Sequence, residues 1–258
     1  MEFTRLALIV LAAAAGSSIN AIAGGGTLVT FPALVALGVP PIIANATSTV
    51  ALLPGSLGSV WGYRGVLAGA RAWATRFSVP SLLGGLVGAI LLLLTSPDRF
   101  EAVVPWLILG ATILFMGQRP VMAMVRRRAG DDTPQEDPIH RPPPPSVLGY
   151  QFAVAVYGGY FGAGIGILML AALGFMGFDN IHRMNGLKNW GGFCINVVAA
   201  ATFVAKGLVD WPVGIAMAFG AMAGGYGASR LAQLVPQMAV RRAIVVIGLG
   251  SAVWLALR

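Results

Sequence analysis

The chain has 258 residues, of which 57% are hydrophobic and 10% are charged, and its formal net charge is +8. A soluble domain of this length would need far more polar surface, so the composition indicates an integral membrane protein. The basic residues lie mostly in short connecting segments, which is typical of residues that orient a protein in a bilayer and contact lipid. Nucleic-acid binding is excluded, because no soluble basic domain exists to hold a duplex.

Eight apolar runs are long enough, or nearly so, to cross a bilayer as a helix of about 20 residues. The shorter runs need tilt or flanking residues to complete the crossing. The first run also fits a signal peptide, but the equivalent run of the second half lies mid-chain, which favours a span. The runs are Leu6–Ala23, Ile42–Tyr63, Trp73–Leu94, Val103–Met116, Val147–Leu173, Leu187–Val204, Trp211–Ala228 and Ala243–Leu257.

Two further apolar runs, Leu28–Leu37 and Ile165–Phe175, follow glycine-rich breaks and are too short to span alone. Each is either the second half of a broken helix or one arm of a re-entrant hairpin. The sequence therefore predicts an all-α fold: a polytopic membrane helix bundle of about eight spans, located in the cell (inner) membrane.

A polar segment, 119–146, divides the chain into a first transmembrane repeat, 1–118, and a second, 147–258. It carries three consecutive arginines, four acidic residues and four consecutive prolines, so it is predicted to be an irregular or polyproline-like linker. A plain spacer is favoured over a docking motif. The distribution of Arg and Lys places the N-terminus and this linker on the cytoplasmic side.

The two halves repeat at an offset of 140 residues, which suggests a duplication into two four-segment repeats. Four segments per half make the repeats parallel, whereas a different count of the glycine-broken segments makes them inverted. The matching pairs are Gly24 and Gly164, Gly26 and Gly166, Asn45 and Asn185, Gly84 and Gly224, Gly85 and Gly225, and Gly110 and Gly250.

The glycine breaks are candidate anion sites. A helix that begins after such a break presents unpaired backbone N–H groups and the positive end of its dipole, and both favour an anion. The alternative is that the glycines only allow close helix packing. Packing is the favoured interpretation for the pairs Gly84-Gly85 and Gly224-Gly225. Because irregular backbone at membrane depth must line a cavity or be buried, the two breaks are expected to face each other near the midplane. The candidate residues are Gly24, Gly25, Gly26 and Thr27, then Gly164 and Gly166.

Two matching polar clusters follow the breaks. The first holds Asn45, Thr47 and Ser48, and the second holds Asn185, Lys188 and Asn189. An ionisable group near the start of a span is a functional candidate, so Lys188 is predicted to bind the substrate with hydrogen bonds from both clusters. Helix capping and interhelical hydrogen bonds are the alternative for the first cluster, and snorkelling to the interface is the alternative for the lysine.

Other polar residues give weaker signals. Ser17, Ser18, Asn20 and Asn196 lie within apolar runs, where they either line a pathway or bridge helices. Asp179 is a candidate proton carrier, and His182 and Arg183 are expected in a connecting turn.

No enzyme or metal constellation is present in the sequence. Cys194 is the single cysteine, and His140 and His182 lack metal-ligand spacing, so neither a metal nor another cofactor is predicted. There is no nucleophile with its base, no paired carboxylates and no phosphate-binding loop, so no catalytic residue is assigned. The acidic residues lie near span ends, which argues against a carboxylate cage for a cation.

Two duplicated stretches carry a family resemblance that covers nearly the whole chain. Residues 23–29, 31–34, 37–40 and 44–48, with 160–166 and 181–189, resemble the sulfite exporter TauE/SafE family. The resemblance implies a multi-pass permease, a probable exporter, of sulfite, sulfoacetate, sulfolactate or related anions. Its partners are then a small anionic substrate and the lipid bilayer, and a homodimer is left open. The alternatives are a permease for a cation or another solute, and a membrane accessory subunit that transports nothing.

Overall fold

The computed structural model describes residues 2–23, 25–129, 139, 141–176, 178, 180–231 and 237–257. Within these ranges the chain forms helices and short connections and no strand, as the all-α prediction requires. The helices are α1 (Glu2–Ala23), α2 (Thr27–Ala36), α3 (Pro41–Ala51), α4 (Leu53–Gly62), α5 (Arg64–Gly69), α6 (Arg71–Leu94), α7 (Pro97–Ala129), α8 (Pro145–Tyr160), α9 (Ile165–Phe175), α10 (Ile181–Ala205), α11 (Trp211–Leu231) and α12 (Gln237–Ala256).

The outer surface is apolar along several helices. Two segments, Arg71–Leu94 and Pro97–Gly117, are long and apolar enough to cross a membrane, and five shorter apolar helices of 10–17 residues accompany them among the described residues. Large side chains such as Trp106, Phe219 and Val246 are 68–71% exposed. A soluble monomer rarely exposes so much contiguous apolar surface, which is consistent with contact to lipid. The count of eight spans remains a prediction.

The predicted span Ile42–Tyr63 is two helices rather than one, because α3 ends at Ala51 and α4 begins at Leu53. Pro54 lies in the first turn of α4, where it lacks the N–H that a continuous helix would need and its ring would meet the preceding turn. The capping role considered for the cluster around Asn45 is also wrong. Pro40 and Pro41 set the start of α3, so Asn45 lies inside the helix.

Two helices are longer than the apolar runs that predicted them. Helix α7 continues through Arg119 to Ala129, so the irregular linker does not begin at residue 119. Its Met, Ala and Arg residues favour a helix, and residues 130–138 lie outside the described ranges. Helix α10 begins at Ile181, where the Asn180 side chain accepts hydrogen bonds from the His182 and Arg183 N–H groups. These two residues therefore form its first turn, not a connecting turn.

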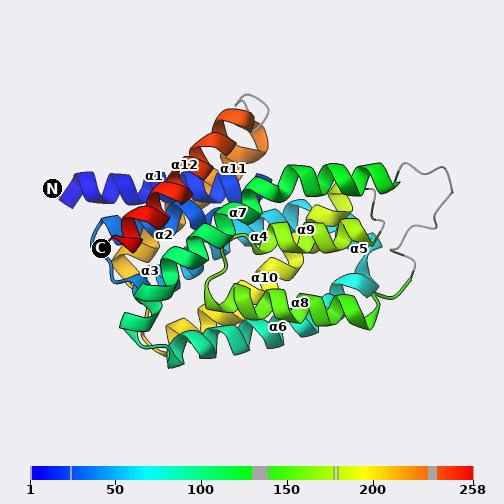
Figure 1. Ribbon diagram of the computed structural model, residues 1–258, viewed down its shortest axis with the longest axis horizontal. Helices are drawn as coiled ribbons and strands as arrows, with labels where there is room; N and C mark the ends of the chain where they lie inside the picture. The colour runs from blue at the N-terminus through cyan, green and yellow to red at the C-terminus, as the bar shows by residue number, and fades with distance from the viewer. Residues whose placement is uncertain are drawn as a thin grey trace.

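Neighbouring helices pair across the two halves of the chain. Helix α1 packs along α11, and α8 packs along α6, so the first helix of each half lies against the third predicted span of the other. Figure 1 shows α6 and α8 side by side along one edge of the molecule, with α1, α11 and α12 at the opposite edge. Helices α7 and α12 contact each other, and α9 and α2 contact α7 and α12 respectively. This reciprocal pairing, in which each half packs its first helix against the other half, is expected of two equivalent halves.

Glycines bring these paired helices into backbone contact. A methyl group on Gly84 would lie 2.6 Å from Ala155 Cβ of α8, and one on Gly88 would lie 2.9 Å from Gly159 Cα. On the other side, a methyl group on Gly224 would lie 2.7 Å from Ala14 Cα of α1. Small residues four apart permit this approach, which is the usual device for tight helix pairs in membranes.

The two glycine breaks lie beside the same stretch of α7. A methyl group on Gly25 would lie 3.3 Å from the Phe115 ring, and one on Gly164 would lie 3.7 Å from Ala111 Cα. Ala111 and Phe115 are four residues apart, so they share one face of α7 at a separation of about 6 Å along its axis. Both breaks therefore contact α7 within the bundle, and that they face each other stays a prediction.

Candidate binding pocket

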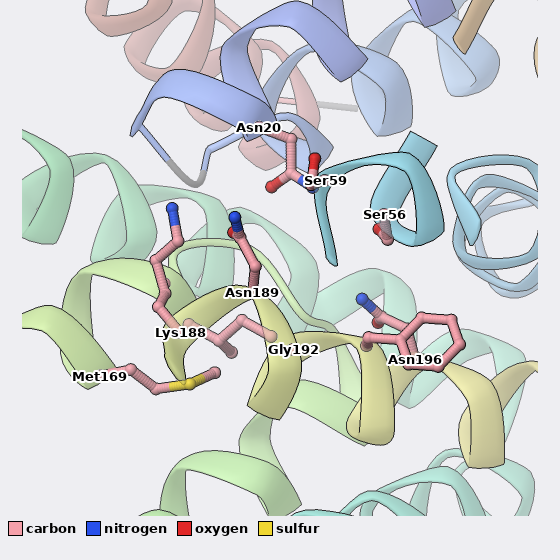
Figure 2. A pocket seen from close by; sticks show the side chains of 11 residues that line it. Asn20, Ser56, Ser59, Met169, Lys188, Asn189, Gly192 and Asn196 are labelled. Atoms are coloured by element: carbon pink, nitrogen blue, oxygen red, sulfur yellow. The ribbon is translucent and has the colours of Figure 1, made fainter. Parts of the chain in front are cut away.

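A pocket lies between helices of the first half, α1 and α4, and helices of the second half, α9 and α10. Its volume is about 400 Å³, which includes space that is open to the surroundings. Figure 2 shows its polar side chains converging from both halves. The lining residues are Asn20, Ser56, Ser59, Ile165, Gly166, Met169, Lys188, Asn189, Gly192, Phe193 and Asn196.

Helix α10 supplies one wall with a lysine and a run of polar residues. Asn189, Gly192 and Asn196 recur at helical spacing, so they share a face of α10, and Lys188 lies beside them. Figure 2 shows the Lys188 and Asn189 side chains directed toward the side on which Asn20 and Ser59 lie. Elsewhere on α10, the Trp190 indole N–H donates to the Ala74 carbonyl and the Ser78 hydroxyl of α6, which fixes the rotation of the helix.

The Lys188 ammonium is buried without a partner. The side chain is 3% exposed, and Nζ has no hydrogen-bond partner among the described residues. The neighbouring Asn189 Nδ2 is likewise buried without an acceptor. A buried charge without compensation is costly, and such a group in a membrane protein is most often functional. The wall of α10 thus offers two donor groups, the Lys188 ammonium and the Asn189 amide, that have no partner in the described part of the chain.

The start of α9 supplies the second wall. Gly164 adopts φ = +80°, a left-handed conformation that suits glycine, and the helix begins at the next residue. Ile165 and Gly166 line the pocket as the first residues of α9, so their N–H groups have no acceptor within the helix. The positive end of the α9 dipole therefore adds to the charge of Lys188.

The opposite wall comes from α1 and α4 and is neutral. The Ser56 hydroxyl donates to the Leu52 carbonyl and the Ser59 hydroxyl donates to the Gly55 carbonyl, each 3.1 Å away. A methyl group on Gly55 would lie 2.5 Å from Ser17 Oγ, so this glycine lets α4 approach α1. A methyl group on Gly26 would likewise lie 2.9 Å from Asn20 Cβ. The first glycine break therefore helps to place Asn20 without lining the pocket itself.

Several predicted site residues lie elsewhere. Of the predicted set, Gly166, Lys188 and Asn189 line the pocket. Gly164 caps the helix that contributes to it, and Asn185 lies one turn earlier on α10 with a buried, unpartnered Oδ1. Gly25, Gly26, Thr27, Asn45, Thr47 and Ser48 do not line it, and Gly24 lies outside the described residues, as do His140 and Asp179.

The first polar cluster is used for contacts between helices. Thr47 Oγ1 accepts a hydrogen bond from the Asp210 N–H at the start of α11, at 3.0 Å. Ser48 and Thr30 share a buried hydrogen bond of 2.7 Å between α3 and α2. These bonds fit the alternative of interhelical hydrogen bonding that the sequence left open for this cluster.

Asn45 forms a hydrogen bond with the segment that leads into the glycine break of the other half. Its Nδ2 donates to the Tyr160 carbonyl at 3.0 Å, and the Tyr157 hydroxyl donates to the Ala163 carbonyl at 2.8 Å. The break frees both carbonyls from helical hydrogen bonds, and irregular backbone within a membrane protein must find partners inside the protein. Asn45 therefore positions the segment from which α9 begins.

We expect Asn45→Ala to lower the stability of the folded protein by about 1–3 kcal/mol, because the partly buried Tyr160 carbonyl loses its donor. Asn45→Asp should be more damaging, since a carboxylate would bring a second acceptor against that carbonyl. The matched control on the same helix is Thr49→Ala, whose hydroxyl bonds the carbonyl of its own helix four residues earlier. Thermal unfolding in detergent measures all three, and an Asn45→Ala protein as stable as wild type would contradict the role.

Sequence reasoning passed over Ser56 and Ser59. The sequence feature that could have indicated them is the stretch from Leu53 to Ser59, which is rich in small residues and has a Pro-Gly pair inside a predicted span. Asn20 and Asn196 were noted as polar residues in apolar runs, and both line the pocket. No group of three or more His, Cys, Asp or Glu side chains that could hold a metal ion occurs in the described part of the chain.

Comparison with known proteins shows the family of this chain. The model of the family described as sulfite exporter TauE/SafE matches residues 8–255. A probable membrane transporter protein, ORF9, of Sinorhizobium sp is 27% identical over 98% of this chain and 93% of its own length. One from Haemophilus influenzae is 28% identical over 94% and 91%, and YfcA, a probable membrane transporter protein of Escherichia coli, is 26% identical over 89% and 81%. No solved structure matches significantly. The family model spans nearly the whole chain, which therefore belongs to the sulfite exporter TauE/SafE family of membrane transporters.

Proposed function

We propose that this transporter moves small sulfur oxyanions or organosulfonates, such as sulfite, sulfoacetate or sulfolactate, out of the cell across the inner membrane. The carrying observation is the unpartnered Lys188 ammonium in a pocket between the two halves of the chain. The start of α9 adds a second positive feature at the same pocket. In repeat-built transporters, substrates bind between the halves at discontinuous helices.

The neighbouring polar groups complete the proposed site. Asn189 and Gly166 contact the anion together with Lys188, and Gly164 fixes the helix start. Asn185 extends the same side of α10. The Asn45, Thr47 and Ser48 cluster supports the site from outside the pocket through its hydrogen bonds to other helices.

The permease reading is favoured over a cation carrier by the lining of the pocket. Its described lining contains one lysine and no carboxylate, whereas Na⁺ and divalent cations need oxygen ligands, often with negative charge. A sealed interior would suit an accessory subunit, but the pocket holds polar groups from four helices and opens to the surroundings.

Counterflow into liposomes that contain the purified protein tests this function directly. We expect at least one of sulfite, thiosulfate, sulfoacetate and sulfolactate to enter preloaded liposomes faster than it enters protein-free ones. The protein should be shown to be monodisperse and helical before reconstitution. If such a protein moves none of the four anions, the proposed substrate class is wrong. Sided vesicles then distinguish export from import.

A further inference from the structure

We propose that, within this chemical class, the pocket binds a singly charged anion more tightly than a dianion. This inference rests on the proposed function, because it concerns which of the sulfur anions the pocket accepts. It favours hydrogen sulfite and simple monosulfonates over sulfoacetate and sulfolactate, which carry a carboxylate as well as a sulfonate.

The positive charge is confined to one side of the pocket. Among its described lining residues, Lys188 carries the single formal charge. Lys188, Asn189 and the first residues of α9 border the same pocket, and neither side-chain nitrogen has a partner within the described protein. One buried cation compensates one negative charge, since a buried ion is tolerated only when it is paired.

The facing wall offers no second cation. Asn20, Ser56 and Ser59 are neutral, and both serine hydroxyls already donate to carbonyls of α4. The remaining walls contain Ile165, Met169 and Phe193, which are apolar. The carboxylate of sulfoacetate or sulfolactate, placed on that side while the sulfonate binds at Lys188, would lose its hydration without gaining a counter-charge. A mismatch of this kind lets a site discriminate between related ligands.

Ligand-dependent thermal stabilisation of the purified protein in detergent tests the inference without relying on transport. The anions are methanesulfonate and nitrate, each with one charge, and sulfoacetate, with two, all at equal ionic strength. Lys188→Gln is measured in parallel, so that general salt effects are subtracted. We expect the Lys188-dependent part of the response to half-saturate at a concentration about tenfold or more lower for methanesulfonate than for sulfoacetate.

A charge-addition variant makes the test specific to the facing wall. Ser59→Lys should narrow the preference for methanesulfonate over sulfoacetate, because it supplies the missing cation. Ser59→Gln adds bulk and hydrogen-bonding capacity without charge, and it should leave the preference in place. The exposed Lys206 at the end of α10 provides Lys206→Gln, a charge-matched control that should respond like wild type.

The outcomes separate the inference from the proposed function. Equal or tighter binding of sulfoacetate by the wild type overturns the single-charge rule, as does the absence of any Lys188-dependent response to the three anions. If methanesulfonate stabilises the protein through Lys188 at lower concentrations than sulfoacetate does while liposomes move no sulfur anion, the rule holds and the transport proposal fails. If liposomes move sulfite but sulfoacetate binds as well as methanesulfonate, the transport proposal holds and the rule fails.

Discussion

Replacing Lys188 with glutamine is expected to weaken substrate binding by about tenfold to a hundredfold while leaving the protein folded. A hydrogen bond to a charged group contributes about 1.5–3 kcal/mol, and each 1.4 kcal/mol corresponds to about a tenfold change in affinity. Folding should survive because Nζ has no partner among the described residues, so the substitution strands no opposite charge there. Stability should equal or exceed that of wild type, since a buried unpaired charge is removed.

The diagnostic result for Lys188→Gln is a lower substrate affinity together with an unchanged or higher stability. Affinity comes from the concentration dependence of counterflow, and stability comes from thermal unfolding of the same preparation. Lys206→Gln removes the other lysine of the chain from an exposed position on the same helix, so it should alter neither quantity. Unchanged affinity in the Lys188→Gln protein would mean that the anion binds elsewhere and that this lysine serves another purpose.

The sequence predicted most of the helices, and three of its candidate residues, Gly166, Lys188 and Asn189, line the pocket. Both results have local reasons. Apolar runs predict helices, and the glycines around Gly164 predict a helix break, because hydrophobicity and glycine content are properties of each segment by itself. Lys188 was found because a charge inside an apolar run is conspicuous wherever the run packs. Asn189 and Asn196 could have been grouped with it more firmly, since they recur at helical spacing on α10.

The neutral half of the pocket could not be predicted, because it depends on how distant segments meet. Ser59 faces Lys188 only because α4 is a separate helix that packs against α1 through Gly55. The same limit explains Asn45. Its position in the chain suggested a helix cap, whereas its partner is the Tyr160 carbonyl, 115 residues away in the other half. A hydrogen bond of this kind leaves no local trace in the sequence.

The contact between α6 and α8 is expected to be the most sensitive packing interface, and Gly88 is its closest point. A methyl group there would overlap the Val156 carbonyl oxygen and lie 2.8 Å from the Tyr160 backbone nitrogen. Backbone atoms cannot move aside as a flexible side chain can, so the two helices must separate. Overpacking of this kind costs about 1–3 kcal/mol even for a small addition, and a larger residue should prevent assembly.

The prediction is a graded series at this glycine. Gly88→Ala should lower the unfolding temperature and the yield of monodisperse protein, and Gly88→Leu should abolish that yield. The control is Gly110→Ala in α7, where an added methyl group meets no atom within 4 Å and where alanine favours the helix. It should express like wild type and be as stable or more so. Size-exclusion profiles and thermal unfolding of the three variants decide the matter. A Gly88→Leu protein that remains monodisperse with normal stability would show that α6 and α8 are not held together by this backbone contact.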